Sequence, residues 1–507
     1  MSNLHPGSRA LPHHRCTRLP AHLLLVVLAV ASAPSTAHPV EDPAAQRIAR
    51  YLEACRDIEV CNGSYLVMRA DQVIYRNAIG HASSTGDEPI GPDHAFDIGS
   101  ISKQFTAAAV MRLVENGRVR LDDRVARYVP SFPYPDITVR HLLTHTSGLP
   151  DLIPHYSRRS ESVSAPAPVL FRGAVETLAD KALPLRFEPG TRHEYSNTGY
   201  IVLADVVEIA ADVPIAEFLS RTFFVPLGMT RTRLRTPENE SSIKPRAYGF
   251  ATRGDGQRRP MDQIANVYLR GAGGIYSTAR DLQIWMRAIL EGKAVSASSW
   301  KAATTPARLT DGSAVPYGFG LSLKPSKLGT SRVTHGGHWR GFKSDLTLWP
   351  THDAAAVQLT NNGEDDSVEQ VRDAVEHILA GGAPSPVLEP AHRALSERLD
   401  RDSLQSVEQW LDTELAARPA RYDFGEKQVN QLGYHLLKRK MADKAVLVFR
   451  ANTRAHPAST NTYDSLADAH LAKGDRSQAL QALRQILQLD PGSSSAKDRL
   501  RSLGEEL

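Results

Sequence analysis

Residues 96–117 read FDIGSISKQFTAAAVMRLVENG, and the fold that we expect for the chain follows mainly from these residues. Asn116-Gly117 supplies a helix stop signal. Ser100 and Lys103 lie three residues apart at the start of the predicted helix, so they share one face. Burial of Lys103 would lower its pKa and let the neutral amine take the proton of a serine hydroxyl. The apolar residues that predict the helix recur at helical spacing, at Phe105, Ala109, Val110 and Leu113.

The spacing Ser-x-x-Lys is weak by itself, because the chain contains it four times. Only Ser100 begins a long apolar helix. The other three pairs lie in polar stretches near Pro, Gly or Ser, where a solvated lysine stays protonated. Ser100 is therefore the candidate nucleophile and Lys103 the candidate base. The four pairs are Ser100/Lys103, Ser241/Lys244, Ser298/Lys301 and Ser494/Lys497.

A second feature is the triplet Tyr195-Ser196-Asn197, which follows the loop Glu188-Pro189-Gly190-Thr191 and precedes a predicted helix over residues 200–211. Side chains on such a turn can project into a cleft. A phenol beside a lysine ammonium is expected to have a lowered pKa, which would suit Tyr195 to relay a proton to a leaving group. The same spacing in Tyr75-Arg76-Asn77 falls within a predicted hairpin strand, and we interpret it as structural.

A third feature is a cationic residue followed by glycine, which would let a substrate lie against a strand edge. Lys327-Leu328-Gly329 and His335-Gly336-Gly337 both fit this description. The lysine lies in a turn-like run, whereas the histidine follows a plausible short strand over residues 331–334. We therefore favour His335.

The order and spacing of these motifs resemble the serine beta-lactamase and penicillin-binding-protein superfamily. Within it, they are similar to the class C-related serine hydrolases, which include esterases, D-aminopeptidases and DD-peptidases. The resemblance implies an α/β (α+β) fold in which a helical lobe packs on an antiparallel sheet, with the site between them. It covers about residues 53–379 and is carried by the runs FDIGSISKQFTAAAVMRLVENG, HLLTHTSGL, EPGTRHEYSNTGY, FFVPLGM and GAGGIYSTARDL.

The resemblance implies a role for each motif. Ser100 would be the acylated nucleophile, Lys103 its general base and Tyr195 a proton shuttle. Asn197 would bind a substrate amide and hold Lys103, and His335 would line the sheet side of the site.

One departure from the family pattern bears on the substrate. The beta-lactamases proper carry Lys-Thr-Gly where this chain has His335-Gly336-Gly337. A histidine has a reference pKa of about 6.5 and is only partly charged near neutrality, so we expect a preference for esters or peptides over penicillins. Arg340 is the candidate replacement cation, although a solvated arginine on the rim of the site is the favoured interpretation. The oxyanion would lie between the backbone amides of Ser100 and His338.

Two histidine pairs have spacings that could suit metal ligands. His141 and His145 are four residues apart, and His335 and His338 are three apart. Neither pair has a His-Glu-x-x-His motif or an acidic third ligand. We therefore expect neither a metal nor another cofactor.

The first 37 residues have the layout of an export signal, with a basic stretch, an apolar run over residues 23–30 and small residues before a cleavage point at Ala33 or Ala37. The apolar run is about half of the ~20 residues that a membrane-spanning helix needs, so a retained anchor is the less favoured alternative. Removal of the signal predicts a periplasmic or secreted protein. There, Cys55 and Cys61 either close a short disulfide loop or stay as two buried thiols.

The composition excludes several classes of protein. The chain has 507 residues, of which 41% are hydrophobic and 23% charged, so disorder throughout and an integral membrane bundle are not expected. A formal charge of +4 is too small to indicate a nucleic-acid-binding surface. No segment after the signal is long and apolar enough to span a bilayer.

A run of small residues and proline around residues 380–386 predicts a boundary between a hydrolase domain over residues 38–383 and a second domain over residues 384–507. The second domain has a period of 34 residues and resembles tetratricopeptide repeats, which implies an all-α domain that binds a protein partner in a concave face. Two copies are few, so we expect support from preceding helices over about residues 399–417 or from the main domain. A packed helical extension without a partner is the alternative. The period joins Lys444/Gln478, Ala445/Ala479, Phe449/Leu483 and Pro457/Pro491.

The sequence therefore predicts an exported serine hydrolase that forms an acyl-enzyme on Ser100 and hydrolyses a small ester, a peptide or another amide. One alternative is a true beta-lactamase or a DD-carboxypeptidase acting on cell-wall peptides. The other is a non-catalytic binding protein that uses the repeats, although the intact Ser100, Lys103 and Tyr195 argue against it.

Overall fold

The computed structural model describes residues 42–153, 169–170, 174–252, 256–264, 267–364 and 367–505. The predicted signal over residues 1–37, with its cleavage points, lies outside these ranges. Within them, no helix is both long and apolar enough to cross a bilayer.

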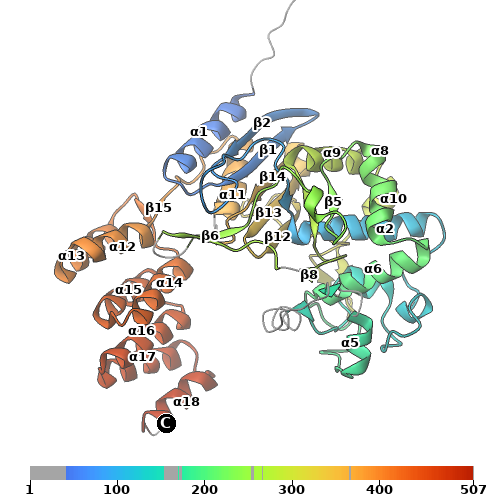
Figure 1. The fold of residues 1–507 in the computed structure, drawn as a ribbon. Helices are drawn as coiled ribbons and strands as arrows, with labels where there is room; N and C mark the ends of the chain where they lie inside the picture. The colour runs from blue at the N-terminus through green and yellow to red at the C-terminus, as the bar shows by residue number, and fades with distance from the viewer. Residues whose placement is uncertain are drawn as a thin grey trace, which may run out of the picture. The chain divides into compact units, whose positions relative to one another are not determined.

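A five-stranded antiparallel sheet lies at the centre of the domain that ends near Leu379 (Figure 1). The first two strands along the chain form the predicted hairpin, with Ala70 in its turn at φ +50°. β12 is an edge strand, so one side of its backbone is not paired within the sheet. In the order β12-β13-β14-β1-β2, the strands are Val333–Trp339, Phe342–Trp349, Ala354–Thr360, Gly63–Arg69 and Gln72–Ile79.

The two faces of the sheet bury different side chains, because neighbouring residues of a strand point to opposite sides. Val67 of β1 joins a core with helices α1 (Pro43–Asp57) and α11 (Ser367–Leu379). Leu66 points the other way, into the larger core of a helical lobe. The sheet is therefore covered by helices on both faces, as Figure 1 shows.

A disulfide joins Cys55 of α1 to Cys61, two residues before β1. The Cα atoms of the two cysteines are 5.3 Å apart, within the usual range for this bond. Of the two alternatives that the sequence left open for these cysteines, the structure contains the bonded one.

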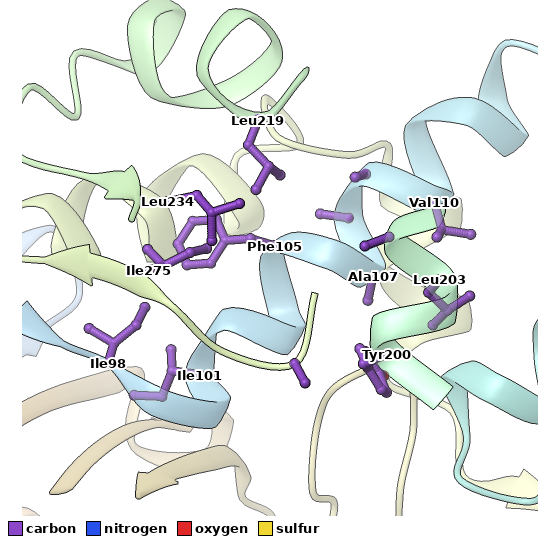
Figure 2. Close-up of a cluster of buried hydrophobic side chains, with 14 of the residues drawn as sticks. Ile98, Ile101, Phe105, Ala107, Val110, Tyr200, Leu203, Leu219, Leu234 and Ile275 are labelled. Carbon is purple, nitrogen blue, oxygen red and sulfur yellow. The ribbon is translucent and has the colours of Figure 1, made fainter. Parts of the chain in front are cut away.

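Helix α2 (Ser102–Glu115) is the central helix of the lobe, as the apolar spacing predicted. Figure 2 shows its residues Phe105, Ala107 and Val110 among side chains from several neighbouring elements. The helix ends at the predicted stop signal, Asn116-Gly117, where Gly117 adopts φ +70°.

Helix α6 (Asn197–Ala211) contacts α2 and begins three residues earlier than the predicted start at residue 200. Asn197 therefore lies in the first turn of a helix and not in the preceding loop. Helix α9 (Ala279–Leu290) begins after Thr278, because the Thr278 hydroxyl accepts the backbone N–H of Asp281 at 3.1 Å.

The remaining elements of this domain are short. The helical ones are η1 (Gly99–Ile101), η2 (Val125–Arg127), α3 (Val139–Leu143), α5 (Ala174–Asp180), α7 (Ile215–Leu219), η4 (Ser220–Phe224), α8 (Val225–Leu227), η5 (Glu240–Ser242), α10 (Ala297–Ala303) and η6 (Pro350–His352). The strands are β3 (Phe96–Asp97), β4 (Val169–Leu170), β5 (Arg233–Leu234), β6 (Phe250–Thr252), β7 (Arg258–Pro260), β8 (Val267–Tyr268), β9 (Ile275–Ser277), β10 (Ala307–Arg308) and β11 (Ala314–Val315).

After Leu379 the described chain is helical, as predicted, apart from the parallel pairing of β15 (Glu389–Pro390) with β16 (Tyr422–Asp423). The helices are α12 (Ala391–Arg401), α13 (Leu404–Ala416), α14 (Glu426–Lys438), α15 (Ala442–Ala455), α16 (Thr460–Lys473), α17 (Arg476–Leu489) and α18 (Ser494–Ser502).

These helices reproduce the period of the sequence. Helices α15 and α17 begin at residues 442 and 476 and have 14 residues each. Leu395 of α12 and Leu411 of α13 share a core with Leu432 and Phe449, so the preceding helices support the repeats as expected. The resemblance to tetratricopeptide repeats and the protein partner stay predictions.

Candidate active site

Lys103 lies at the centre of the site and contacts three acceptors. Its Nζ atom is 2.9 Å from Ser100 Oγ, 2.8 Å from Asn197 Oδ1 and 2.9 Å from the backbone oxygen of Ala272. The short helix η1 presents Ser100 one turn before Lys103, and α6 presents Asn197 in its first turn. The predicted helix and the triplet Tyr195-Ser196-Asn197 therefore come together at the Lys103 amine.

The side chain of Lys103 is completely buried, which removes water from its charged form. Burial lowers the pKa of Lys103 to about 7, and the nearby Asp151 carboxylate opposes this fall. The lowered pKa agrees with the expectation from the sequence. Near neutral pH, a large share of the molecules hold Lys103 as a free amine.

Asp151 is a residue that the sequence reasoning missed. Its Oδ2 accepts a hydrogen bond from Asn197 Nδ2 at 2.8 Å. This bond fixes the orientation of the Asn197 amide, so that the amide oxygen faces Lys103. Asp151 lies 46 residues before Asn197 in sequence, and no local spacing connects the two.

Tyr195 lies beside Lys103, with the amine 4.9 Å from the centre of its ring. The residue is 39% exposed and lines the cavity described below. Burial of its hydroxyl nevertheless raises the pKa of Tyr195 well above the usual value, and a hydrogen bond with Ser100 opposes this rise only in part. The predicted lowered pKa of Tyr195 is therefore wrong, because desolvation outweighs the charge of the neighbouring amine. Tyr195 is a neutral phenol that can give a proton.

His335 lies on β12, opposite the helical lobe, as one end of a chain of buried polar side chains. The Tyr317 hydroxyl is 2.9 Å from His335 Nε2 and 3.1 Å from His145 Nε2. His145 Nδ1 accepts the backbone N–H of Ser196, and His335 Nδ1 is 2.6 Å from the backbone oxygen of Gly336. One pattern satisfies all these contacts with neutral rings: His145 donates to Tyr317, Tyr317 donates to His335, and His335 donates to Gly336.

His335 carries no charge at neutral pH. Burial and the charge of Lys103 lower the pKa of His335 to about 4. The expectation of a partly charged histidine therefore needs correction, since the ring is neutral well below physiological pH. Tyr317 had no signal in the sequence analysis, and His145 was noted there only for its spacing from His141.

The free edge of β12 supplies a backbone amide near Ser100. Thr334 exchanges both of its backbone hydrogen bonds with Ser322, so its polar groups point away from β13. Backbone groups alternate along a strand, and the N–H of His338 therefore points toward the same open edge. A Cβ atom on Gly99 would lie only 2.7 Å from that nitrogen, and Gly99 has φ +52°, so glycine is needed there. Gly337 allows the same close approach, because a Cβ there would lie 2.1 Å from the oxygen of Ile98.

A cavity of about 830 Å³ joins these features. Ser100, Tyr195 and Asn197 line its helical side, and the His335–Trp339 part of β12 lines its sheet side, including the predicted Gly336, Gly337 and His338. Arg340 lies beyond this wall in the turn before β13, where its Nε donates to the backbone oxygen of Asp262 at 3.3 Å. The structure thus gives Arg340 a contact with the segment that follows β7 and does not place it in the wall of the cavity.

The family described as Beta-lactamase matches this chain over residues 48–380. Penicillin-binding protein 4* of Bacillus subtilis (strain 168) is 32% identical over 330 residues, which cover 63% of this chain and 72% of that protein. A D-aminopeptidase of Brucella anthropi is 28% identical over 282 residues, which cover 55% of this chain and only 52% of that enzyme. Among solved structures, the octameric penicillin-binding protein homologue from Pyrococcus abyssi is similar with a TM-score of 0.58 and 26% identity, covering 67% of this chain and 78% of that one.

The fold and these relatives define the class of protein as a serine hydrolase with a beta-lactamase-like fold. The chain belongs to the beta-lactamase family. The resemblance seen in the sequence is thereby confirmed over residues 48–380.

Proposed function

We propose that this chain hydrolyses an ester, a peptide or another amide through an acyl-enzyme on Ser100. One observation carries the proposal: Lys103 Nζ lies 2.9 Å from Ser100 Oγ, and burial lowers the pKa of Lys103 to about 7. A base whose pKa is close to the working pH is the most effective partner for a weak nucleophile such as serine.

Acylation starts when neutral Lys103 takes the proton of the Ser100 hydroxyl. The Ser100 Oγ atom bonds to the substrate carbonyl carbon, and the carbonyl electron pair moves onto oxygen. The backbone amides of Ser100 and His338 donate hydrogen bonds to this oxyanion. When the oxyanion collapses, the bond to the leaving nitrogen or oxygen breaks, and Tyr195 gives that atom its phenol proton. The Lys103 ammonium then returns a proton to Tyr195.

In deacylation, water takes the place of Ser100 as the attacking group, and Ser100 becomes the leaving group. Neutral Lys103, restored at the end of acylation, takes a proton from water as the water oxygen attacks the ester carbon on Ser100. The second oxyanion occupies the same two amides and collapses when the bond to Ser100 Oγ breaks. The proton taken from water passes to Ser100, so the free acid leaves and the enzyme is restored.

The substrate group that faces β12 is uncharged in this proposal. His335 is neutral, and burial of an unpaired carboxylate against it would be costly. The D-aminopeptidase relative supports a peptide or amide substrate. The 32% sequence identity with penicillin-binding protein 4* favours the alternative, which is a DD-carboxypeptidase or beta-lactamase acting on cell-wall peptides or their analogues.

We also propose that the protein is exported to the periplasm or secreted. The signal-like sequence over residues 1–37 and the Cys55–Cys61 disulfide support this location. The helical repeats after Leu379 are proposed as a surface for a protein partner, on the strength of their 34-residue period.

The deciding experiment is labelling with a fluorophosphonate, read by intact mass, in wild type, Ser100→Ala and Ser298→Ala. Ser298 is an exposed serine of another Ser-x-x-Lys pair and is the matched control. We expect Ser100→Ala alone to lose the label. No labelling of wild type would contradict the hydrolase and favour the binding-protein alternative.

A panel of short acyl esters, D-amino-acid amides and peptides, and beta-lactams then tests the substrate class. We expect turnover of the esters and amides to exceed that of the beta-lactams, with Ser100→Ala as the blank. A cephalosporin turned over much faster than the esters would contradict the proposed substrate and favour the beta-lactamase alternative.

A further inference from the structure

Asp97 is a buried carboxylate that takes no part in the proposed reaction. It is only 1% exposed and lies three residues before Ser100. Its Oδ1 accepts the backbone N–H of Gly99 at 2.8 Å, which shapes the turn that presents Ser100. Its Oδ2 accepts a hydrogen bond from Gln263 Nε2, also at 2.8 Å.

Gln263 connects this carboxylate to the opposite wall of the cavity. Its Oε1 accepts a hydrogen bond from Trp339 Nε1 at 2.8 Å, and Trp339 directly follows His338 on β12. Its Nε2 also donates to the Tyr276 hydroxyl at 2.9 Å. A single amide side chain therefore joins the residues before Ser100 to the residue after His338.

These two segments carry the two backbone amides proposed to stabilise the oxyanion. They are in close contact, since a Cβ atom on Gly99 would lie 2.7 Å from His338 N. Donors of this kind act only when they point to the position where the negative charge develops. A displacement of about 1 Å costs roughly 10²-fold in rate, so a side chain that fixes their separation affects the reaction without touching the substrate.

We propose that Gln263 is a positioning residue that holds the amides of Ser100 and His338 at the separation that the oxyanion needs, through Asp97 on one side and Trp339 on the other. This inference rests on the proposed hydrolase function. The directions of the hydrogen bonds make it specific, because the carboxylate accepts from the amide nitrogen and the amide oxygen accepts from the indole.

The test uses two single variants that each disrupt the hydrogen bond between Asp97 and Gln263, and a double variant that restores it. Asp97→Asn places a side-chain nitrogen against the nitrogen of Gln263. Gln263→Glu places a second carboxylate against Asp97. In the double variant, the carboxylate introduced at position 263 accepts from both the amide introduced at position 97 and the Trp339 indole, and Tyr276 turns its hydroxyl proton toward that carboxylate. The double variant also keeps the net charge of wild type.

Kinetics are measured at pH 8, where Asp97, with a pKa raised by burial to about 6, is ionised. We expect each single variant to lower kcat roughly 10- to 100-fold, with KM changed less than about threefold. We expect the double variant to recover kcat to within about fivefold of wild type. Gln481→Glu, on the exposed side of α17, is the control for the same change of charge.

Rates are expressed per active site, counted by the fluorophosphonate label, so that loss of folded protein is not read as loss of kcat. A role in folding alone would lower the labelled fraction or the Tm and leave kcat per labelled site unchanged. Losses that multiply in the double variant, or that appear only in KM, would also overturn the inference.

Trp339→Phe is a second route if the charge-altering variants do not fold. It removes the indole N–H and keeps an aromatic ring, and we expect kcat to fall roughly 3- to 10-fold. An unchanged kcat would contradict the proposal. Wild type without Ser100-dependent turnover would overturn both this inference and the hydrolase, whereas active wild type without recovery in the double variant would overturn this inference alone.

Discussion

The two walls of the cavity beside Ser100 each bury a basic side chain, and burial has opposite consequences on the two sides. On the helical wall, the pKa of Lys103 falls from 10.5 to about 7, so the amine changes charge near neutral pH. On the sheet wall, the pKa of His335 falls from 6.5 to about 4, so the ring is neutral near pH 7. The same desolvation makes a base of one residue and an uncharged surface of the other.

The hydrogen-bond partners of Lys103 suit a charged amine, whereas those of His335 suit a neutral ring. Lys103 Nζ contacts a hydroxyl, an amide oxygen and a backbone oxygen, and Asp151 lies beyond them. All of these can accept from an ammonium. His335 is placed between a donating Tyr317 hydroxyl and an accepting backbone oxygen, an arrangement that a neutral ring satisfies completely. Substitutions that remove the amine of Lys103 or add one at position 335 therefore test whether the two walls differ in this way.

The largest effect is expected from Lys103→Met, which removes the base and keeps a side chain of similar length. The Ser100 hydroxyl then has no group to take its proton, and we expect kcat/KM to fall roughly 10³-fold, within the range of a general base. Steady-state hydrolysis of a short acyl ester measures this loss. Lys301→Met, in another Ser-x-x-Lys pair, is the matched control and should change the rate less than about twofold. Near-wild-type turnover of Lys103→Met would assign the base to a different residue.

An intermediate effect is expected from His335→Lys, which replaces a neutral ring with an amine whose reference pKa of about 10.4 lies well above that of histidine. We expect the ratio of kcat/KM for a carboxylate-bearing beta-lactam to that for a neutral ester to rise about tenfold, because a charge-assisted hydrogen bond becomes available. His335→Gln is the matched control, since its amide is neutral and can still accept from Tyr317. The ratio should stay within about twofold for His335→Gln. An equal shift in both variants would show that the charge of residue 335 does not decide the preference.

The smallest effect is expected from Asp151→Asn, read in the pH dependence of kcat/KM. In wild type, activity should rise with pH through about 7, because only the neutral form of Lys103 acts as a base. The Asp151 carboxylate favours the ammonium, so its removal lets Lys103 lose its proton at lower pH. We expect the rise to move to lower pH and the rate at pH 6 to increase about two- to threefold.

Two controls accompany the pH profile. Asp71→Asn, in the β1–β2 turn, makes the same change of charge at an exposed position and should leave the profile in place. High salt should reduce the difference between Asp151→Asn and wild type, since Asp151 is exposed and its field is screened. A shift of the profile to higher pH would contradict the assigned effect of this carboxylate.

The sequence predicted the helical wall better than the sheet wall, for a physical reason. Ser100 and Lys103 are one helical turn apart, so the period of the helix brings them together whatever surrounds it. The approach of Tyr195 and Asn197 came from the family resemblance, because no local rule joins residues almost a hundred positions apart. Asp151, Tyr317 and Gln263 were missed, since each contacts the site from a separate segment that no motif marks.

The sequence also predicted the wrong direction for the pKa of Tyr195, because burial depends on segments that are distant in the sequence. The sequence predicts which charges are near a phenol when a helix or a motif places them there. It does not give the amount of water that the folded chain removes, and for Tyr195 this desolvation outweighs the neighbouring amine.

The sequence alone predicted the pairing of Ser100 with Lys103, the hairpin, the central helix, the family and the 34-residue period of the last helices. These features depend on short-range periodicity or on motifs that can be recognised in one chain. The tertiary structure was needed for the protonation of Tyr195 and His335, the orientation of the Asn197 amide and the hydrogen bonds of Gln263 to Asp97 and Trp339. Those properties depend on burial and on which distant atoms meet, and both arise only when the walls of the cavity close around one another.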